Sequence, residues 1–289
     1  MQQVYLNGDF MDANQASISP MDRGFLFGDG IYEVIPCYKS TNEQLMPVGL
    51  KAHLTRMRNG LAAVQIPYQV NFDEWRAIIN QLVNHTAEAQ GVYIHISRGA
   101  DSKRFHAYPK HITPTIFAYA FDIAPSVESD NAAVKTFKVQ LCEDLRWKRC
   151  HIKSTSLLGN VMHFQQGQDA GVDEVILYND HGEITEAAAC NVFMVKDNVV
   201  YTPPLDNQIL PGITRQIALA AMRKSGDFDV RELAFSKSQL LDADEIWITS
   251  SSKEIAPVSH LDGNCVGEEA PGPVWRRAQA AYNRFKFDD

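Results

Sequence analysis

The stretch CHIKSTSLLGN, residues 150–160, places the charged side chain of Lys153 among apolar and hydroxyl-bearing neighbours. No acidic residue lies within five positions of Lys153 on either side. A lysine in such a place is ordinarily a surface residue, whose hydrocarbon stem packs along apolar atoms while its ammonium reaches water. The alternative is a lysine in a dry pocket, where burial disfavours the ammonium and the amine becomes a nucleophile toward aldehydes. Lys153 is therefore a candidate for covalent chemistry.

The composition is that of a soluble globular protein, and the length suits an enzyme. The chain has 289 residues, of which 45% are hydrophobic and 21% charged, and this length is sufficient for two domains. With a net charge of -8, the chain as a whole lacks the excess of basic residues that is typical of a nucleic-acid-binding protein. No apolar run approaches the roughly 20 residues of a membrane helix, and MQQVYLNGDF has no signal-peptide pattern. The odd number of cysteines, five without a CxxC pair, favours reduced thiols in the cytoplasm and argues against a zinc site.

The periodicity of apolar residues predicts both strands and helices. Strands are predicted at 91–97, 113–123, 134–142 and 244–252, and helices at 71–90, 160–171 and 213–226. Two further hairpins are predicted around turns at Asp180–Gly182 and Asp197–Asn198. The strands and helices alternate without the regular spacing of a parallel βαβ array, which favours an α+β fold.

A polar segment with proline, APSVESDNAA, interrupts both periodicities at residues 124–133. It predicts a linker between two domains. We therefore expect a small N-terminal α/β domain at 1–122, a linker at 123–133 and a larger C-terminal domain at 134–289, in which we expect a cofactor-binding site.

A lysine that forms a Schiff base with pyridoxal 5′-phosphate requires a phosphate anchor elsewhere in the chain. Gly212 directly precedes a predicted helix, so the N–H groups of Ile213 and Thr214 point outward at the positive end of the helix dipole. The segment TSSSKE (249–254) ends a strand in three serines, which can form a nest of hydroxyls and amides. Arg56 can clamp a phosphate with two donors. Each feature alone has an ordinary explanation as a helix start, a turn or a solvated charge, and only their coexistence favours a phosphate site.

Two further patterns fit the same chemistry. Glu186 lies among small residues in GEITEAAACNVF. A carboxylate facing the ring nitrogen keeps that nitrogen protonated, so the ring can accept electrons from a substrate carbanion; the ordinary alternative is a surface carboxylate. Arg104 and His106 are two positions apart in SKRFHAYP, so on an extended loop they point the same way and suit a substrate carboxylate. The ordinary alternative there is a polar loop.

Seven motifs, in order along the chain, resemble the fold-type IV pyridoxal-phosphate enzymes. That group includes branched-chain aminotransferases, D-amino-acid transaminases and aminodeoxychorismate lyases. Tyr32 together with Arg104-x-His106 is most similar to the D-amino-acid transaminases, in which these residues hold the substrate α-carboxylate and the arginine and histidine come from the other subunit of a homodimer. The motifs are DRGFLFGDGIYEV (22–34), HLTRM (53–57), RFHAYP (104–109), IKSTSLLGN (152–160), ITEAAACNVF (184–193), ILPGITR (209–215) and ITSSSKEIAPV (248–258).

The resemblance implies a role for each matched residue and a reaction. Transamination between a D-amino acid, such as D-alanine or D-glutamate, and a 2-oxo acid is implied, with pyridoxal 5′-phosphate as the cofactor and no metal, nucleic acid or membrane. The implied roles are Lys153 as Schiff base and proton shuttle; Glu186 at the ring nitrogen; Arg56, Ile213, Thr214 and Ser251 at the phosphate; Leu210 beside the ring; and Tyr32, Arg104, His106 and Ser252 at the substrate.

One segment departs from the resemblance. Ala187, Ala188, Ala189 and Cys190 follow Glu186, where D-amino-acid transaminases carry small hydroxyl residues. Branched-chain or (R)-amine transamination and aminodeoxychorismate lyase activity stay open as alternatives on the same fold, although Arg104-x-His106 disfavours them. A catalytically silent binding protein is the alternative of a different class, and the presence of both Lys153 and Glu186 disfavours it.

Overall fold

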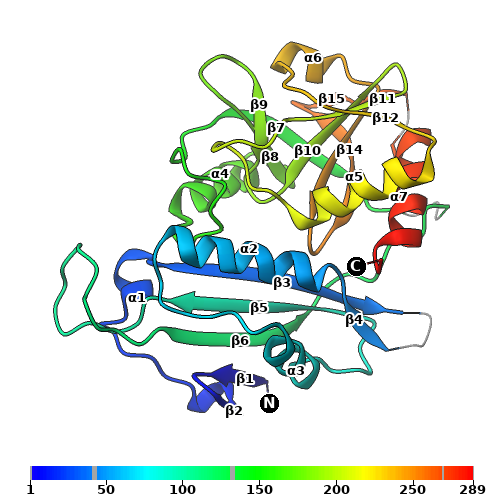
Figure 1. The fold of residues 1–289 in the computed structure, drawn as a ribbon. Helices are drawn as coiled ribbons and strands as arrows, with labels where there is room; N and C mark the ends of the chain where they lie inside the picture. The colour runs from blue at the N-terminus through cyan, green and yellow to red at the C-terminus, as the bar shows by residue number, and fades with distance from the viewer. Residues whose placement is uncertain (1, 41–43, 131–133, 269, 289) are drawn as a thin grey trace. The chain divides into compact units, whose positions relative to one another are not determined.

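The computed structural model describes residues 2–40, 44–130, 134–268 and 270–288. The chain forms two compact units (Figure 1). The first comprises the chain up to Pro125 together with Ile152–Leu157, and the second comprises Ser126–His151 and Leu158–Asp288. The predicted domain boundaries instead place 152–157 in the C-terminal domain. Residues 131–133 of the predicted linker lie outside the described residues.

The first unit is built on a six-stranded antiparallel sheet in the order β2-β1-β6-β5-β3-β4 (Figure 1). Val92, Ile94 and Ile96 alternate along β5, as predicted, and all three are fully buried. The strands are β1 (Gln3–Leu6), β2 (Asp9–Asp12), β3 (Gly30–Lys39), β4 (Leu45–Pro47), β5 (Ala89–Ser97) and β6 (Thr115–Asp122).

Helices cover the apolar face of this sheet. Besides the short α1 (Arg23–Phe27), the first unit contains α2 (Leu50–Ala63) and α3 (Phe72–Leu82), which pack with β3 and β5 in one hydrophobic core. The Asn71 side chain caps α3 by accepting hydrogen bonds from the amides of Asp73 and Glu74. The predicted helix at 71–90 is therefore correct in type but ends at Leu82.

The second unit contains a nine-stranded mixed sheet in the order β12-β11-β10-β13-β14-β7-β8-β9, with β15 paired to β14. The helices α5 and α7 pack together over a core that includes the buried Trp247 and Trp275. The strands are β7 (Phe137–Glu143), β8 (Glu174–Tyr178), β9 (Ile184–Ala187), β10 (Asn191–Lys196), β11 (Val199–Thr202), β12 (Asp229–Glu232), β13 (Glu245–Ser250), β14 (Glu254–Leu261) and β15 (Asn264–Cys265); the helices are α4 (Leu158–Asp169), α5 (Ile213–Ser225), α6 (Lys237–Leu241) and α7 (Pro273–Phe285).

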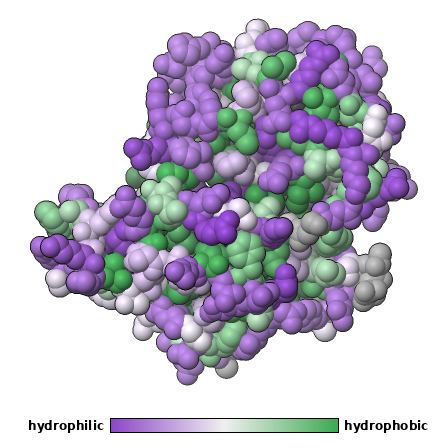
Figure 2. Space-filling model, in the orientation of Figure 1, coloured by the Kyte–Doolittle hydropathy of each residue, from purple (hydrophilic) through white to green (hydrophobic). Residues whose placement is uncertain are grey.

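Both predicted hairpins in the second unit are confirmed: β8 pairs with β9, and β10 with β11. Asp197 and Asn198 both have positive φ, at 51° and 62°, as a two-residue hairpin turn of this kind requires. Figure 2 shows hydrophilic residues over most of the visible surface of each unit, interrupted by small hydrophobic groups. None of the helices in the described ranges is long and apolar enough to span a membrane.

Candidate active site

The segment that carries Lys153 pairs with strand β3 of the first unit. The Tyr32 amide donates to the Lys153 carbonyl at 3.0 Å, and the Thr155 amide donates to the Gly30 carbonyl at 3.0 Å. Gly28 has a φ of +65°, and a Cβ at this position would lie 2.7 Å from Ser156 Oγ. A glycine is therefore required where residues 152–157 approach the start of β3.

This pairing brings Lys153 and Tyr32 together. Lys153 Nζ lies 4.2 Å from the centroid of the Tyr32 ring, and both side chains are partly buried. On the same face of the sheet, the Tyr93 ring lies 5.8 Å from that of Tyr32, and Tyr119 lies beyond it at 5.5 Å. The lysine predicted to hold the cofactor therefore lies against a row of tyrosine rings, and the first of these belongs to the tyrosine predicted to contact the substrate.

Arg56 is held by a carboxylate that was not predicted from the sequence. Arg56 Nε and Nη2 lie 2.8 and 2.7 Å from the two oxygens of Glu33, and His53 Nδ1 lies 2.7 Å from Glu33 Oε2. Burial alone would raise the pKa of Glu33, but Arg56 and His53 outweigh it and lower the pKa to about 2. Burial lowers the pKa of His53. The sequence does contain a sign of this buried carboxylate: Glu33 alternates with Ile31 and Ile35, so all three lie on the same, buried face of β3.

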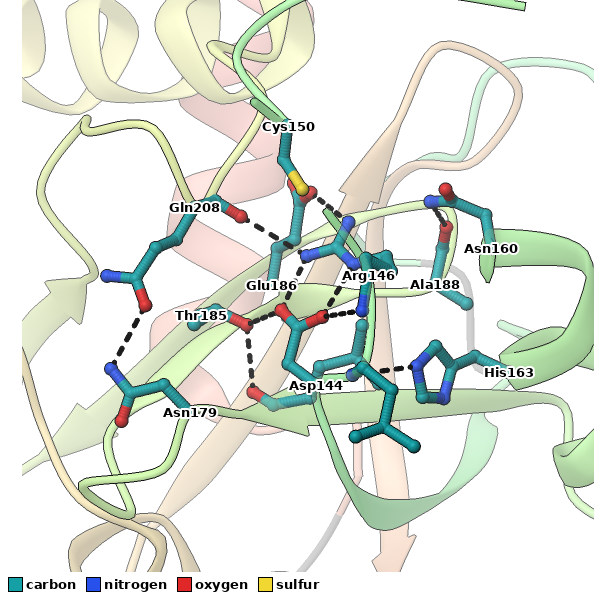
Figure 3. A network of polar contacts seen from close by, with 12 residues as sticks. Asp144, Arg146, Cys150, Asn160, His163, Asn179, Thr185, Glu186, Ala188 and Gln208 are labelled. Atoms are coloured by element: carbon teal, nitrogen blue, oxygen red, sulfur yellow. Dashed lines mark hydrogen bonds and ion pairs between the residues drawn. The ribbon is translucent and has the colours of Figure 1, made fainter. Parts of the chain in front are cut away.

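In the second unit, Glu186 lies at the end of β9 and is buried (Figure 3). Its Oε1 lies 2.5 Å from Arg146 Nη1, and its Oε2 accepts hydrogen bonds from the Leu210 amide at 2.9 Å and from Asn191 Nδ2 at 3.2 Å. Burial raises the pKa of the Glu186 carboxyl, and Arg146 opposes this rise. Three donors therefore fix the orientation of this carboxylate.

Arg146 belongs to a larger polar network (Figure 3). Its Nε and Nη2 lie 3.0 and 2.8 Å from the two oxygens of Asp144, and Thr185 Oγ1 donates to Asp144 at 2.8 Å. Arg146 Nη2 also donates to the Gln208 carbonyl at 3.2 Å. Although burial raises the pKa of Asp144, Arg146 lowers it overall, so Asp144 supplies a stable negative charge. Arg146 is not among the residues predicted from the sequence, and its one local signal is its position two residues after Asp144.

The start of α5 offers donors that fit a phosphate. Gly212 is its N-cap, no side chain caps the helix, and the amides of Ile213 and Thr214 lie in its first turn. A Cβ on Gly212 would lie 1.9 Å from Asn191 Oδ1, so only glycine permits this close approach. Asn191 is paired with Thr249 across β10 and β13, and Thr249 Oγ1 is buried without a hydrogen-bond partner in the part of the chain that the structure describes.

The remaining predicted residues lie in loops. Leu210, whose amide binds Glu186, is partly buried just before α5, and Ser251 and Ser252 are partly buried in the turn after β13. Arg104 and His106 lie in the exposed loop after β5. The Arg104 guanidinium is 5.1 Å and the His106 ring 5.3 Å from the ring of Phe27, so both contact the same side chain.

Each unit thus gathers a separate set of the predicted residues. The first unit holds Tyr32, Arg56, Arg104, His106 and Lys153, and the second holds Glu186, Leu210, Ile213, Thr214, Ser251 and Ser252. The roles of these residues stay predictions.

Residues 30–261 match the model of the amino-transferase class IV family. The chain belongs to the class IV aminotransferases. It is 36% identical to the D-alanine aminotransferase of Bacillus licheniformis over 96% of this chain and 95% of that protein. It is also 34% identical to the D-alanine aminotransferase of Staphylococcus haemolyticus, over 99% of this chain and 98% of that protein. The predicted family and the predicted aminotransferase activity are thereby confirmed.

Solved structures confirm the predicted fold class for this class IV aminotransferase. The branched-chain amino acid aminotransferase of Escherichia coli superposes with a TM-score of 0.86 at 25% identity, over 98% of this chain and 94% of that one. The PLP form of the branched-chain enzyme of Thermobaculum terrenum superposes with a TM-score of 0.85 at 19% identity, over 99% and 94%. The α+β architecture is that of the fold-type IV aminotransferases.

Proposed function

We propose that this class IV aminotransferase transfers an amino group from a D-amino acid, such as D-alanine or D-glutamate, to a 2-oxo acid, with pyridoxal 5′-phosphate as cofactor. The relatives named D-alanine aminotransferase match almost the whole chain. The single observation that carries the proposal is the 4.2 Å approach of Lys153 Nζ to the Tyr32 ring. It places the only lysine of the matched motif beside the tyrosine that the D-amino-acid transaminase pattern assigns to the substrate.

The donor set fits this cofactor. Within the described part of the chain, the start of α5 has no side-chain cap and the hydroxyl of Thr249 has no hydrogen-bond partner, and both suit a phosphate. The buried Glu186 suits a protonated ring nitrogen. When bound, pyridoxal phosphate supplies an aldehyde that joins an amine and a ring that accepts electrons from the substrate Cα. The residues that would hold it are Arg56, Ile213, Thr214 and Ser251 at the phosphate, Leu210 beside the ring, Glu186 at the ring nitrogen and Lys153 as the covalent attachment.

Lys153 and Glu186 have complementary proton roles. The Lys153 amine would remove the α-proton of the substrate and deliver it to the C4′ carbon of the cofactor. An ionised Glu186 would accept a hydrogen bond from the ring N–H and keep the ring protonated. The positive charge of Arg146 favours the ionised form of Glu186, so the carboxylate would not take that proton itself. Tyr32, Arg104, His106 and Ser252 orient the substrate by its α-carboxylate, which decides which enantiomer presents its Cα–H to Lys153.

We further propose a homodimer in which Arg104 and His106 serve the site of the other subunit. The surface of α4 supports association, because Leu158, Val161 and Met162 follow at i, i+3 and i+4 and each is more than half exposed. Leu145 and Trp147, also exposed, lie in the adjacent loop, where the Leu145 amide donates to His163 of α4. Clustered apolar side chains of this kind mark protein interfaces. Met162→Arg should lower the mass measured by light scattering, whereas Gln165→Arg, at an exposed polar position of α4, should not.

A substrate panel tests the proposed reaction. D-alanine with 2-oxoglutarate should support turnover well above L-leucine or (R)-1-phenylethylamine. A preference for L-branched-chain substrates would overturn the D-amino-acid assignment, and absence of turnover with every donor would favour a silent binding protein.

Peptide mapping tests the role of Lys153. Borohydride reduction of the loaded enzyme should leave the pyridoxyl group on Lys153, and a label on any other lysine would overturn the mechanism. Lys153→Ala should still bind the cofactor through its phosphate but should not turn over.

A further inference from the structure

The loop that carries Arg104 and His106 is anchored by a buried arginine from α1. Arg23 is 3% exposed, and its Nη1 donates to the carbonyl of Phe105 at 2.5 Å, while its Nη2 donates to that of His106 at 3.2 Å. A longer contact of 3.5 Å joins Nη1 to the Ala107 carbonyl. One guanidinium therefore binds the backbone of three consecutive loop residues.

The Arg23 guanidinium is itself fixed by a shared carboxylate. Arg23 Nε lies 2.8 Å from Asp29 Oδ2, and Arg98 binds both oxygens of Asp29 at 2.7 and 2.9 Å. Arg98 is 1% exposed and also donates to the carbonyls of Val64 and Gln65 at 2.7 and 2.8 Å. The planar fork of arginine provides donors in fixed directions, so each guanidinium has little freedom to rotate.

A second contact holds the far end of the loop. The Arg98 guanidinium stacks over the ring of Tyr108 at 3.6 Å from its centroid. Residues 102–108 are otherwise exposed and contain no regular helix or strand. The two buried arginines thus contact a loop segment that has no secondary structure of its own.

We propose that Arg23 is a positioning residue for substrate recognition: by clamping the backbone at 105–107, it fixes where Arg104 and His106 present their donors to a substrate carboxylate. This inference rests on the proposed role of Arg104 and His106 in the D-amino-acid reaction. The clamp acts on the loop before substrate binds, so it spares the substrate the entropic cost of ordering these side chains.

Arg23→Lys tests the clamp while keeping the positive charge beside Asp29. A single ammonium cannot serve Asp29 and three carbonyls at once, so the loop should open more often. Trypsin should then cleave after Lys103 and Arg104 about 10-fold faster than in the wild type, as expected for the loss of a charged hydrogen bond. The cut sites are mapped by mass spectrometry. Arg76→Lys is the matched control, because Arg76 lies in the same unit, is 66% exposed and forms a surface ion pair with Asp73.

Kinetics test the consequence for substrate. In Arg23→Lys the KM for D-alanine should rise about 10-fold, while kcat at saturating substrate stays within about 2-fold, because the loop binds ground and transition states alike. In the background of Arg104→Ala, the Arg23→Lys change should have no further effect on kcat/KM, since the positioned side chain is gone. Thermal unfolding of each variant shows whether the fold is retained.

Three outcomes would overturn the inference. Unchanged tryptic cleavage in Arg23→Lys would show that Arg23 does not hold the loop. Faster cleavage with an unchanged KM would show that the loop does not set carboxylate affinity. Additive losses in the double variant would show that Arg23 does not act through Arg104. If the proposed reaction itself is wrong, the wild-type enzyme will not turn over D-alanine. That result is distinct from the three outcomes above.

Discussion

Arg146 Nη1 lies 2.5 Å from Glu186 Oε1, and both side chains are buried. Because Arg146 also binds both oxygens of Asp144, the guanidinium is shared between two carboxylates. Burial alone would lower the pKa of Arg146, but Asp144 and Glu186 raise it overall, so the arginine keeps its charge. The carboxylate proposed for the ring nitrogen therefore has a fixed orientation and a permanent counter-charge.

Glu186→Gln should slow α-proton removal by about 100-fold, because the loss of one preorganised charge at a reacting group costs this much. The fold should survive, since Arg146 keeps its pairing with Asp144. Stopped-flow absorbance of the half-reaction with D-alanine measures the rate. Glu143→Gln, at an exposed carboxylate of β7, is the control. A wild-type rate in Glu186→Gln would remove this residue from the mechanism.

Arg146→Gln should destabilise the enzyme by about 3–5 kcal/mol at pH 7, because it leaves buried carboxylates without their counter-charge. The pKa of Glu186, already raised by burial, should rise further. A carboxyl whose pKa is higher in the folded than in the unfolded state makes folding less favourable as pH rises through the interval between those two values. The difference in unfolding free energy between variant and wild type, measured with urea, should therefore be larger at pH 8 than at pH 5. A gap that does not depend on pH would contradict this.

Glu33 should make the enzyme sensitive to acid. Its pKa is lowered from 4.5 to about 2, so the stability that it contributes is present above about pH 4.5 and is lost as pH falls toward 2. The full contribution is roughly 3 kcal/mol. In Glu33→Gln, the difference in unfolding free energy from the wild type should shrink between pH 6 and pH 3, measured by urea titration. A constant difference over this range would show that the ionisation of Glu33 does not contribute.

Gly212→Ala should weaken cofactor binding by about 10-fold or more, because the new Cβ would lie 1.9 Å from Asn191 Oδ1 and would displace either Asn191 or the start of α5. Titration of the cofactor-free enzyme, followed by absorbance, gives the Kd. Gly159→Ala is the control, since its Cβ would meet its nearest neighbour at an ordinary 3.4 Å. An equal loss of cofactor affinity in the two variants would show that the close approach of Gly212 to Asn191 does not determine cofactor binding.

Arg104→Ala should lower kcat/KM for D-alanine by about 10- to 100-fold, because a charge-assisted contact with the α-carboxylate contributes roughly 1.5–3 kcal/mol. The absorbance of the bound cofactor should not change, because the residues proposed to hold the cofactor are unaltered. Full D-alanine activity in this variant would favour the branched-chain alternative.

The sequence by itself predicted the fold class, several of the strands and helices, and the class of reaction. Alternation in GVYIHIS and the turn at Asp197–Asn198 predicted local structure that is present, because such patterns depend on neighbours in the chain. Lys153 and Glu186 could be proposed because their motifs are short and contiguous. Strand β3 was not predicted, although its alternation of Ile31, Glu33 and Ile35 was there to be read.

Only the tertiary structure decided which side chains support that chemistry. Glu33 binds Arg56 because β3 and α2 pack together, and Arg146 reaches Glu186 because the loop after β7 meets β9. The backbone of 152–157 joins β3, far away in the sequence, so Lys153 belongs to the first unit. Partners of this kind are set by which strands and helices pack together, and no local period or propensity encodes that choice.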